Sequence, residues 1–261
     1  MTDWLYRLPE LLLVALSAGL LAAAVIWLPR WVQRVPFLAP TEPGFEFVIR
    51  MQAPLFTMTA LVLTFTLVEA ERNFRQVDSN VTTEASQISQ LDRLLARFDG
   101  ADARADRPLL RVYAQSIVRD EWPMMLRRGE GSEKTRLAFT AVSRAVLALD
   151  PKPGRQALIF AEMLKSLEAI AQSRDARLDS VVVGLPGIYW VVILFSMVML
   201  LLVSSAIPRT PFRSAILAAQ LAVMGAFVGF VFIMDSPYKG ENAVAPDPIS
   251  RASTAMEKRE G

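Results

Sequence analysis

The 261-residue sequence contains no cysteine and no histidine. It therefore lacks the usual ligands of structural zinc and haem, thiol nucleophiles, disulfides and the commonest acid–base catalyst. Its 12 glycines are scattered, and neither a P-loop nor a Gly-x-Gly-x-x-Gly fingerprint occurs. We therefore expect no enzyme, with no catalytic residue, no cofactor-binding residue and no metal site.

Charge is nearly absent from four apolar stretches, at about residues 8–28, 54–70, 185–207 and 215–234. About 20 apolar residues in a helix cross a hydrocarbon core of ~30 Å. The first stretch is longer than the apolar core of a signal peptide, so we interpret it as an uncleaved span. The sequence therefore predicts an all-α membrane protein with four transmembrane helices.

The segment between the second and third spans is rich in charge but nearly neutral. Residues 71–184 carry 18 Lys and Arg against 16 Asp and Glu. A nucleic-acid groove needs clustered basic residues, so we expect no nucleic-acid partner. The predicted organisation is a first transmembrane pair at 1–70, a helical extramembrane module at 71–184, a second transmembrane pair at 185–234 and a polar tail at 235–261.

Glu84 interrupts an apolar heptad in the second long helix, which we expect to run from Pro54 to Phe98. The apolar positions of this heptad are Phe74, Val77, Val81, Ile88, Leu91, Leu95 and Phe98. A carboxylate on such a seam must be paired, neutralised or exposed to water. We predict a buried pair with Arg174 or Arg177 of the last module helix; a water-facing or ion-facing carboxylate in a vestibule is the alternative.

Prolines are expected to mark several boundaries. Pro108 should begin the second module helix and Pro123 should end it. Asp235 and Pro237 follow the last span, where the carboxylate can satisfy freed backbone groups in a turn near the membrane surface. We read them as a membrane-exit turn, with a ligand role for Asp235 as the alternative.

Two polar stripes run along the second span. Thr57 and Thr64 lie on one side, and Thr59 and Thr66 lie on nearly the opposite side. Threonine hydroxyls in a span usually bond their own helix or a neighbouring one, so helix packing is the simpler interpretation. The alternative is a pore lining formed by Phe56, Thr57, Thr64 and Phe65, with a phenylalanine as the apolar constriction.

A set of short motifs resembles a known family. It comprises Phe65, Glu71-Arg72, Val81, Glu84-Ala85, Leu91, Tyr113, Glu121-Trp122-Pro123, Arg174-x-x-Arg177-Leu178, Gly184-Leu185-Pro186, Trp190 and Asp235-Ser236-Pro237-Tyr238-x-Gly240. In this order and spacing, over roughly residues 50–250, the chain resembles the bacterial bestrophin-like family, which is distantly similar to bestrophin anion channels. The family often has an arginine where this chain has Ser236. The resemblance implies four spans, homo-oligomerisation and ion-channel activity.

These observations favour a multi-pass protein of a bacterial inner membrane. Its expected partners are the lipid bilayer, further copies of the same chain and small inorganic ions. The alternative function is a non-conducting scaffold or sensor whose helical module binds a partner. Arginines next to the membrane on the module side favour a cytoplasmic module with both termini cytoplasmic.

The four-span interpretation predicts that both termini and the module share one side of the membrane. Reporter proteins fused after residues 2, 120 and 261 should all report the same side. A reporter that disagrees with the other two would exclude four spans.

Overall fold

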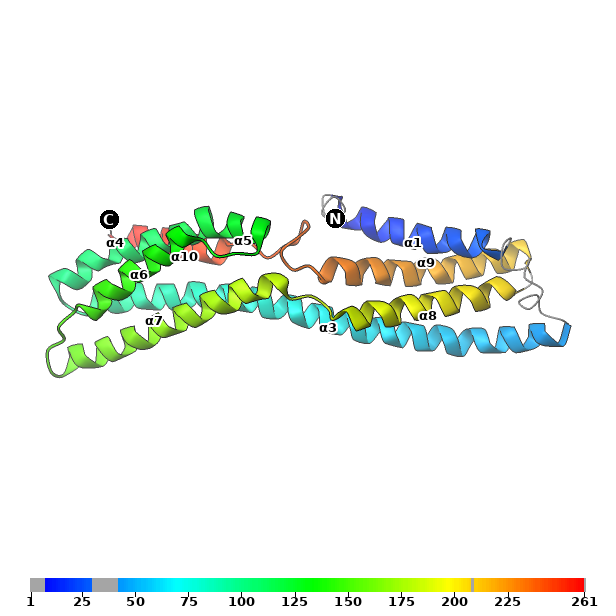
Figure 1. Cartoon of the computed structure of the whole chain (residues 1–261), viewed down its shortest axis with the longest axis horizontal. Coiled ribbons are helices and arrows are strands. Elements are labelled where there is room, and N and C mark those ends of the chain that lie inside the picture. Colours follow the sequence, from blue (N-terminus) through cyan, green and yellow to red (C-terminus); the bar gives the residue numbers. More distant parts are fainter. Residues whose placement is uncertain (1–7, 30–41, 208, 261) are drawn as a thin grey trace. The chain divides into compact units, whose positions relative to one another are not determined.

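The computed structural model describes residues 8–29, 42–207 and 209–260, which form helices joined by turns (Figure 1). These described residues include no strand. The chain divides into two compact units, Met1–Phe74 with Gly184–Ala243 and Arg75–Val183 with Val244–Gly261. Helix α3 (Glu42–Arg97) contributes residues to both units. The predicted all-α class is confirmed.

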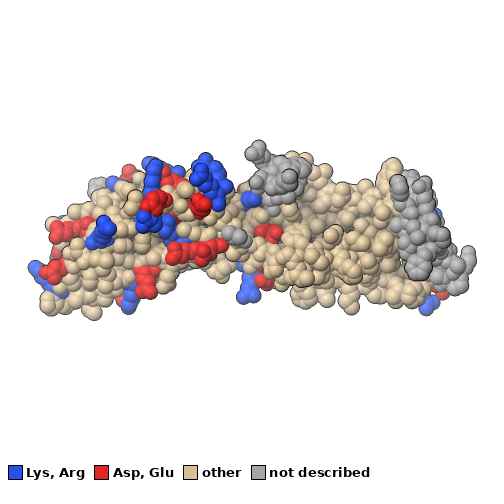
Figure 2. All heavy atoms as spheres, in the orientation of Figure 1, with Lys and Arg blue, Asp and Glu red and all other residues tan. Residues whose placement is uncertain are grey.

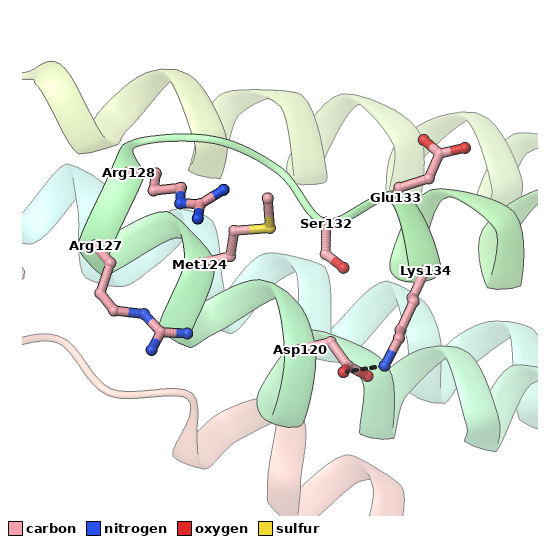
Figure 3. A pocket seen from close by; sticks show the side chains of 7 residues that line it. All are labelled: Asp120, Met124, Arg127, Arg128, Ser132, Glu133 and Lys134. Atoms are coloured by element: carbon pink, nitrogen blue, oxygen red, sulfur yellow. Dashed lines mark hydrogen bonds and ion pairs between the residues drawn. The ribbon is translucent and has the colours of Figure 1, made fainter.

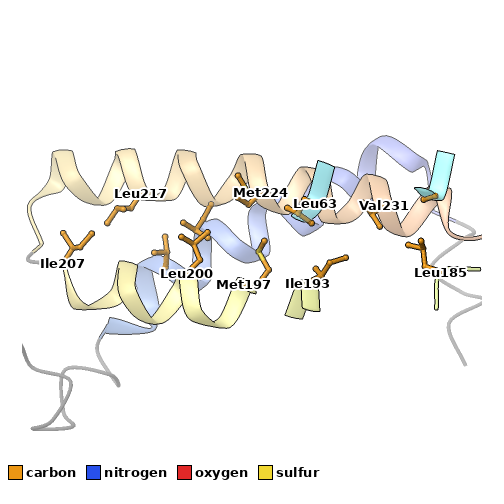
Figure 4. Packing of buried hydrophobic residues seen from close by; sticks show 12 residues of the cluster. Leu63, Leu185, Ile193, Met197, Leu200, Ile207, Leu217, Met224 and Val231 are labelled. Carbon is orange, nitrogen blue, oxygen red and sulfur yellow. The ribbon is translucent and has the colours of Figure 1, made fainter. Parts of the chain in front are cut away.

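The described residues of the first unit include four helices that are long and apolar enough to cross a membrane. They are α1 (Glu10–Trp27), the first part of α3, α8 (Gly187–Ala206) and α9 (Pro211–Met234). Their apolar residues point both outward and inward, as expected where the solvent is lipid. The inward set includes Leu63, Met197, Leu200 and Met224, which belong to one core (Figure 4). The four predicted spans are confirmed.

Two glycines bring α9 into close contact with α1. A Cβ at Gly225 would lie 2.4 Å from the carbonyl oxygen of Ser17, and one at Gly229 would lie 2.3 Å from the Ser17 hydroxyl. The spacing Gly225-x-x-x-Gly229 is a known signal for close helix packing in membranes, because small residues let two backbones approach. The signal is present in the sequence and could have predicted this contact.

The predicted start of the second long helix at Pro54 was wrong. Helix α3 begins at Glu42, so Pro54 lies inside it. Pro43 falls in the first turn of α3, where a missing N–H group costs nothing. An internal proline is tolerated in a membrane helix where neighbouring groups satisfy the freed backbone. The predicted continuity of the helix as far as residue 97 is observed.

The second unit is a helical bundle with a charged surface. It contains the later part of α3, α4 (Ala101–Ser116), a π-helix η3 (Ile117–Glu121), α5 (Trp122–Arg128), α6 (Glu133–Leu147), α7 (Arg155–Asp179), a 3₁₀ turn η4 (Ser180–Val182) and α10 (Asp247–Glu260). On the face drawn in Figure 2, Lys, Arg, Asp and Glu gather over these helices. The apolar seam of α3 faces inward, since Val81, Ile88, Leu91 and Leu95 are all fully buried.

The boundaries predicted at Pro108 and Pro123 were also wrong. Helix α4 starts at Ala101, so that Pro108 lies within it, and the chain continues through η3 into α5 with Pro123 in the first turn. A π-helical turn shifts the hydrogen-bonding register, and such turns occur mostly as single insertions in α-helices. The extra residue lets the chain pass Pro123, which has no N–H group, without leaving the helix.

The close approach of α1 and α9 gives a stability prediction. Gly225→Ala should lower the stability of the purified protein by ~1–3 kcal/mol, because the new methyl group overpacks the contact with Ser17. Thermal unfolding in detergent would measure this loss. Gly19→Ala is the matched control, since nothing lies within 4 Å of a Cβ there. Equal melting temperatures for the two variants would contradict the packing role of Gly225.

Candidate functional site: a buried ion network and the outward face of the second span

Arg177 of α7 is the centre of a buried ion network in the second unit. Its side chain is fully buried, and its Nε donates to Glu84 Oε2 of α3 at 2.6 Å. Its Nη2 donates to Glu84 Oε1 at 3.2 Å and to Glu121 Oε1 of η3 at 2.7 Å. The structure therefore brings Glu84 and Arg177 together, and it adds a second carboxylate from a third element.

Glu121 accepts from a second arginine as well. Arg174, one turn before Arg177 on α7, donates from Nε to both carboxylate oxygens of Glu121 at 3.1 and 3.2 Å, and its Nη2 also contacts Oε2. The backbone N–H of Ser132 donates to Glu121 Oε2 at 3.1 Å. Arg174 thus pairs with Glu121, and within the described residues no ion pair joins it to Glu84. Two carboxylates and two guanidinium groups balance the charge of the network.

Two aromatic side chains and a methionine sulfur also contact the charged groups of the network. The Tyr113 hydroxyl donates to Glu84 Oε1 at 3.4 Å, and the ring of Tyr113 packs 5.2 Å from that of Phe139. The Arg177 guanidinium lies 5.8 Å from the centre of the Trp122 ring, and its Nη1 lies 3.5 Å from Met125 Sδ. These groups exclude water, which strengthens each charge–charge interaction.

The environment shifts the pKa values of the network in consistent directions. Burial raises the pKa of Glu121, but the hydrogen bonds and charges of Arg174 and Arg177 outweigh burial and hold it below its ordinary value. Burial lowers the pKa of Arg177, but Glu84 and Glu121 more than compensate and raise it. Burial, followed by the charge of Glu84, raises the pKa of Tyr113. At neutral pH, Glu121 and Arg177 are therefore charged and Tyr113 is neutral.

Three of the four residues predicted to line a pore lie on the outward side of α3, whereas Phe56 packs against the core of its unit. Thr57, Thr64 and Phe65 are exposed, and Phe56 is half-buried. Each of the two threonine hydroxyls donates to a carbonyl of its own helix, Thr57 to Ala53 at 3.0 Å and Thr64 to Ala60 at 2.8 Å. The opposite stripe faces the bundle of its own unit.

The second polar stripe of α3 is buried against the other helices of its own unit. Thr59 and Thr66 are 1% and 2% exposed. The nearby Gln52 side chain is also buried, and its Nε2 donates to the Ser204 hydroxyl of α8 at 3.0 Å. The two predicted stripes therefore differ in environment. The stripe of Thr59 and Thr66 is covered within a single chain, whereas the stripe of Thr57 and Thr64 is exposed.

Asp235 accepts a hydrogen bond from a backbone N–H group that is far from it in the sequence. Its carboxylate accepts from the N–H of Leu185, just before α8, and from Trp190 Nε1 at 3.2 Å. A Cβ at Gly184 would lie 3.3 Å from Asp235 Oδ1, so the glycine leaves room for the carboxylate. Pro237 is buried in the turn that follows. Asp235 thus satisfies a freed backbone group, and it joins the ends of α8 and α9.

Known proteins similar to this chain agree with this architecture. A family model for the bestrophin-like domain matches residues 18–249. The chain belongs to the bestrophin-like domain family. It matches no curated protein.

Solved structures share the fold of this bestrophin-like chain. One is a crystal structure of a membrane protein with a single substitution; it is 12% identical, has a TM-score of 0.68, and the match covers 97% of this chain and 98% of that one. Two are crystal structures of a bacterial bestrophin homolog from Klebsiella pneumoniae, each with one substitution. They are 12% and 13% identical, with TM-scores of 0.64 and 0.66, and cover 96% of this chain and 96% and 97% of theirs.

Sequence reasoning missed two buried carboxylates of this bestrophin-like chain. Glu121 was noted only as part of a motif, and its position next to Trp122 and Pro123 gave no sign of burial. Asp92 is fully buried, and it accepts from Arg107 Nε at 2.9 Å and from Arg259 Nη1 of α10 at 2.6 Å. No local pattern joins residues that lie so far apart in the sequence. Asp92 fastens the C-terminal helix to the bundle.

The pairing of Glu84 with Arg177 predicts non-additive losses of stability. Glu84→Ala should destabilise the protein by ~3–5 kcal/mol, because it leaves a buried guanidinium without its partner. The double change of Glu84→Ala with Arg177→Ala should cost less than the sum of the single changes. Thermal unfolding of the four proteins in detergent measures this coupling.

Two control cycles sharpen the result. Glu84→Ala with Arg174→Ala should be closer to additive, since Arg174 bonds Glu121. The exposed pair of Glu162 and Lys165 on α7, 2.8 Å apart, should show coupling below ~1 kcal/mol. Additive losses for Glu84 and Arg177 would refute a direct energetic interaction between them.

Proposed function

We propose that this membrane protein assembles as a homo-oligomer that conducts small inorganic ions, with the Thr57 and Thr64 face of α3 along the conduction path. The observation that carries the proposal is the exposure of this face. Of the two polar stripes on α3, only that of Thr59 and Thr66 is buried within the chain. An exposed polar stripe on a membrane span suits contact with water or with another helix.

The chemistry of the stripe supports this role. Because the hydroxyls of Thr57 and Thr64 donate to carbonyls of their own helix, each still has a lone pair that can accept from water. Phe65 is 65% exposed on the same helix and supplies the bulk for an apolar constriction. Apolar constrictions in ion pathways can gate conduction by dewetting.

A hollow on another side of α3, next to Thr66 and Phe65, supports contact with a second copy. It has a volume of about 360 Å³ and lies between α3 and α8, with a largely apolar lining. It is lined by Val62, Phe65, Thr66, Ile188, Tyr189 and Val192. A helix of a neighbouring copy would fill such a hollow by van der Waals packing, which drives helix association in lipid. The proposed location is a bacterial inner membrane with the module and both termini in the cytoplasm.

A non-conducting scaffold or sensor is the second candidate. The threonine hydroxyls of the stripe are already satisfied by their own helix, so the stripe can also be covered by a neighbouring helix without further hydrogen bonds. The second unit exposes Leu137, Leu147 and Leu158, which are 54%, 63% and 73% exposed. These apolar side chains would suit a protein partner of a scaffold.

Ion flux through purified oligomer in liposomes separates the two candidates. Phe65→Ala or Phe56→Ala should raise the flux by widening the constriction, whereas Thr64→Leu should lower it by adding an apolar plug. Phe195→Ala on α8 is the matched control, because Phe195 is 63% exposed but lies on another span. It should leave the flux unchanged. If no variant carries flux under several ionic conditions, conduction is refuted in favour of the scaffold.

A further inference from the structure

A cavity in the second unit lies apart from the buried ion network and from the outward face of α3. Its volume is about 510 Å³, and it sits where α5 ends and α6 begins (Figure 3). The residues that line it are Asp120, Met124, Arg127, Arg128, Ser132, Glu133 and Lys134. Figure 3 shows Arg127 and Arg128 on one side, Lys134 and Asp120 on the other, and Met124 and Ser132 between them.

Positive charge in this cavity exceeds negative charge. Asp120 is paired with Lys134 at 3.3 Å. Glu133 is held by both Nε and Nη2 of Arg136, its neighbour on α6, and points away from the centre of the view in Figure 3. Arg127 donates only its Nε, to the carbonyl of Pro123 at 3.1 Å, and Arg128 has no ion pair among the described residues. Two guanidinium groups are therefore left to bind an anion.

Ser132 is a largely buried residue that adds a hydroxyl donor next to the cavity, and no hydrogen bond of this hydroxyl occurs within the described residues. The residue is 5% exposed and occupies the N-cap of α6, yet its side chain caps no N–H group of that helix. Its backbone N–H is turned inward to Glu121, while its hydroxyl points into the space between Met124 and Lys134 (Figure 3). A serine at an N-cap normally accepts from the first turn. This serine instead presents its hydroxyl to the cavity.

We propose that this cavity binds a phosphate-bearing small anion. Guanidinium groups match phosphate oxygens by paired, charge-assisted hydrogen bonds, and Lys134 and the Ser132 hydroxyl supply further donors. The uncapped start of α6 adds N–H groups and the positive end of the helix dipole. The volume of about 510 Å³ leaves room for a ligand with more than one phosphate group or with an organic part. Both a soluble phosphate ester and a lipid headgroup have this chemistry.

Occupancy of the cavity acts on the buried ion network through Ser132. The hydroxyl of this residue contacts the ligand while its N–H donates to Glu121, and Asp120 precedes Glu121 in the same π-helical turn. A bound anion therefore fixes the loop that holds Glu121 against Arg174 and Arg177. A ligand that binds only the folded protein raises its melting temperature, by an amount that grows with the logarithm of the ligand concentration. The proposal is independent of whether the protein conducts ions.

Titration of pyrophosphate into the full-length protein in neutral detergent tests the site by calorimetry and by thermal shift. The wild-type protein should bind saturably and melt at a higher temperature when bound. Arg128→Gln should weaken binding by about tenfold, equivalent to ~1.4 kcal/mol. Ser132→Ala should weaken it by several-fold while leaving the N–H bond to Glu121 and the melting temperature of the free protein unchanged.

A matched control and a second probe complete the test. Arg104→Gln removes the same charge from an exposed position of the same unit and should change the affinity by less than about twofold. Competition by a short-chain, water-soluble phosphatidic acid tells a lipid headgroup from a soluble ester. Displacement of pyrophosphate supports the lipid source, and no displacement supports the soluble ester. The proposal is overturned if neither probe binds saturably, or if Arg104→Gln weakens binding as much as Arg128→Gln.

Discussion

The second unit depends on one fully buried guanidinium, that of Arg177. A charge without access to water is stable only when opposite charges and hydrogen bonds surround it, and here Glu84 and Glu121 supply both. Because these partners come from α3 and η3, Arg177 on α7 requires all three elements to be in register. Apolar packing on the α3 seam tolerates small shifts, whereas this paired geometry does not. The network therefore sets the register of the bundle.

The π-helical turn at Ile117–Glu121 is a consequence of the same requirement. It changes the direction of the residues that follow α4, so that Glu121 faces inward between two arginines while Pro123 continues into α5. The same turn leaves the Ser116 carbonyl accepting from the Thr135 hydroxyl at 3.2 Å, which ties α6 to the turn. The π-helical turn, the buried carboxylate of Glu121 and the loop before α6 are thus connected by hydrogen bonds. They lie next to the cavity that Ser132 lines.

The first unit follows a different principle, because in lipid the apolar character of a side chain gives no preference for the interior. Its helices are instead located by small residues and by a few polar contacts. Gly225 and Gly229 admit the backbone of α1, Gln52 bonds Ser204, and Asp235 bonds the backbone before α8. The stripe of Thr57 and Thr64 differs from the apolar residues around it on the exposed side of α3, because its side chains are polar.

The sequence by itself determined the all-α class, the four spans and the unusual position of Glu84 on an apolar seam, because hydropathy and heptad period are local properties of the chain. It did not determine that Glu84 meets Arg177 while Arg174 meets Glu121, since both arginines lie one turn apart on the same face of α7. Nor did it mark Asp92, whose partners Arg107 and Arg259 are brought to it by folding alone. Helix starts were misplaced at Pro54 and Pro108 because a proline only permits a boundary, and neighbouring structure decides whether the helix begins earlier. Burial and pairing depend on which helices pack together, and only the tertiary structure decided that.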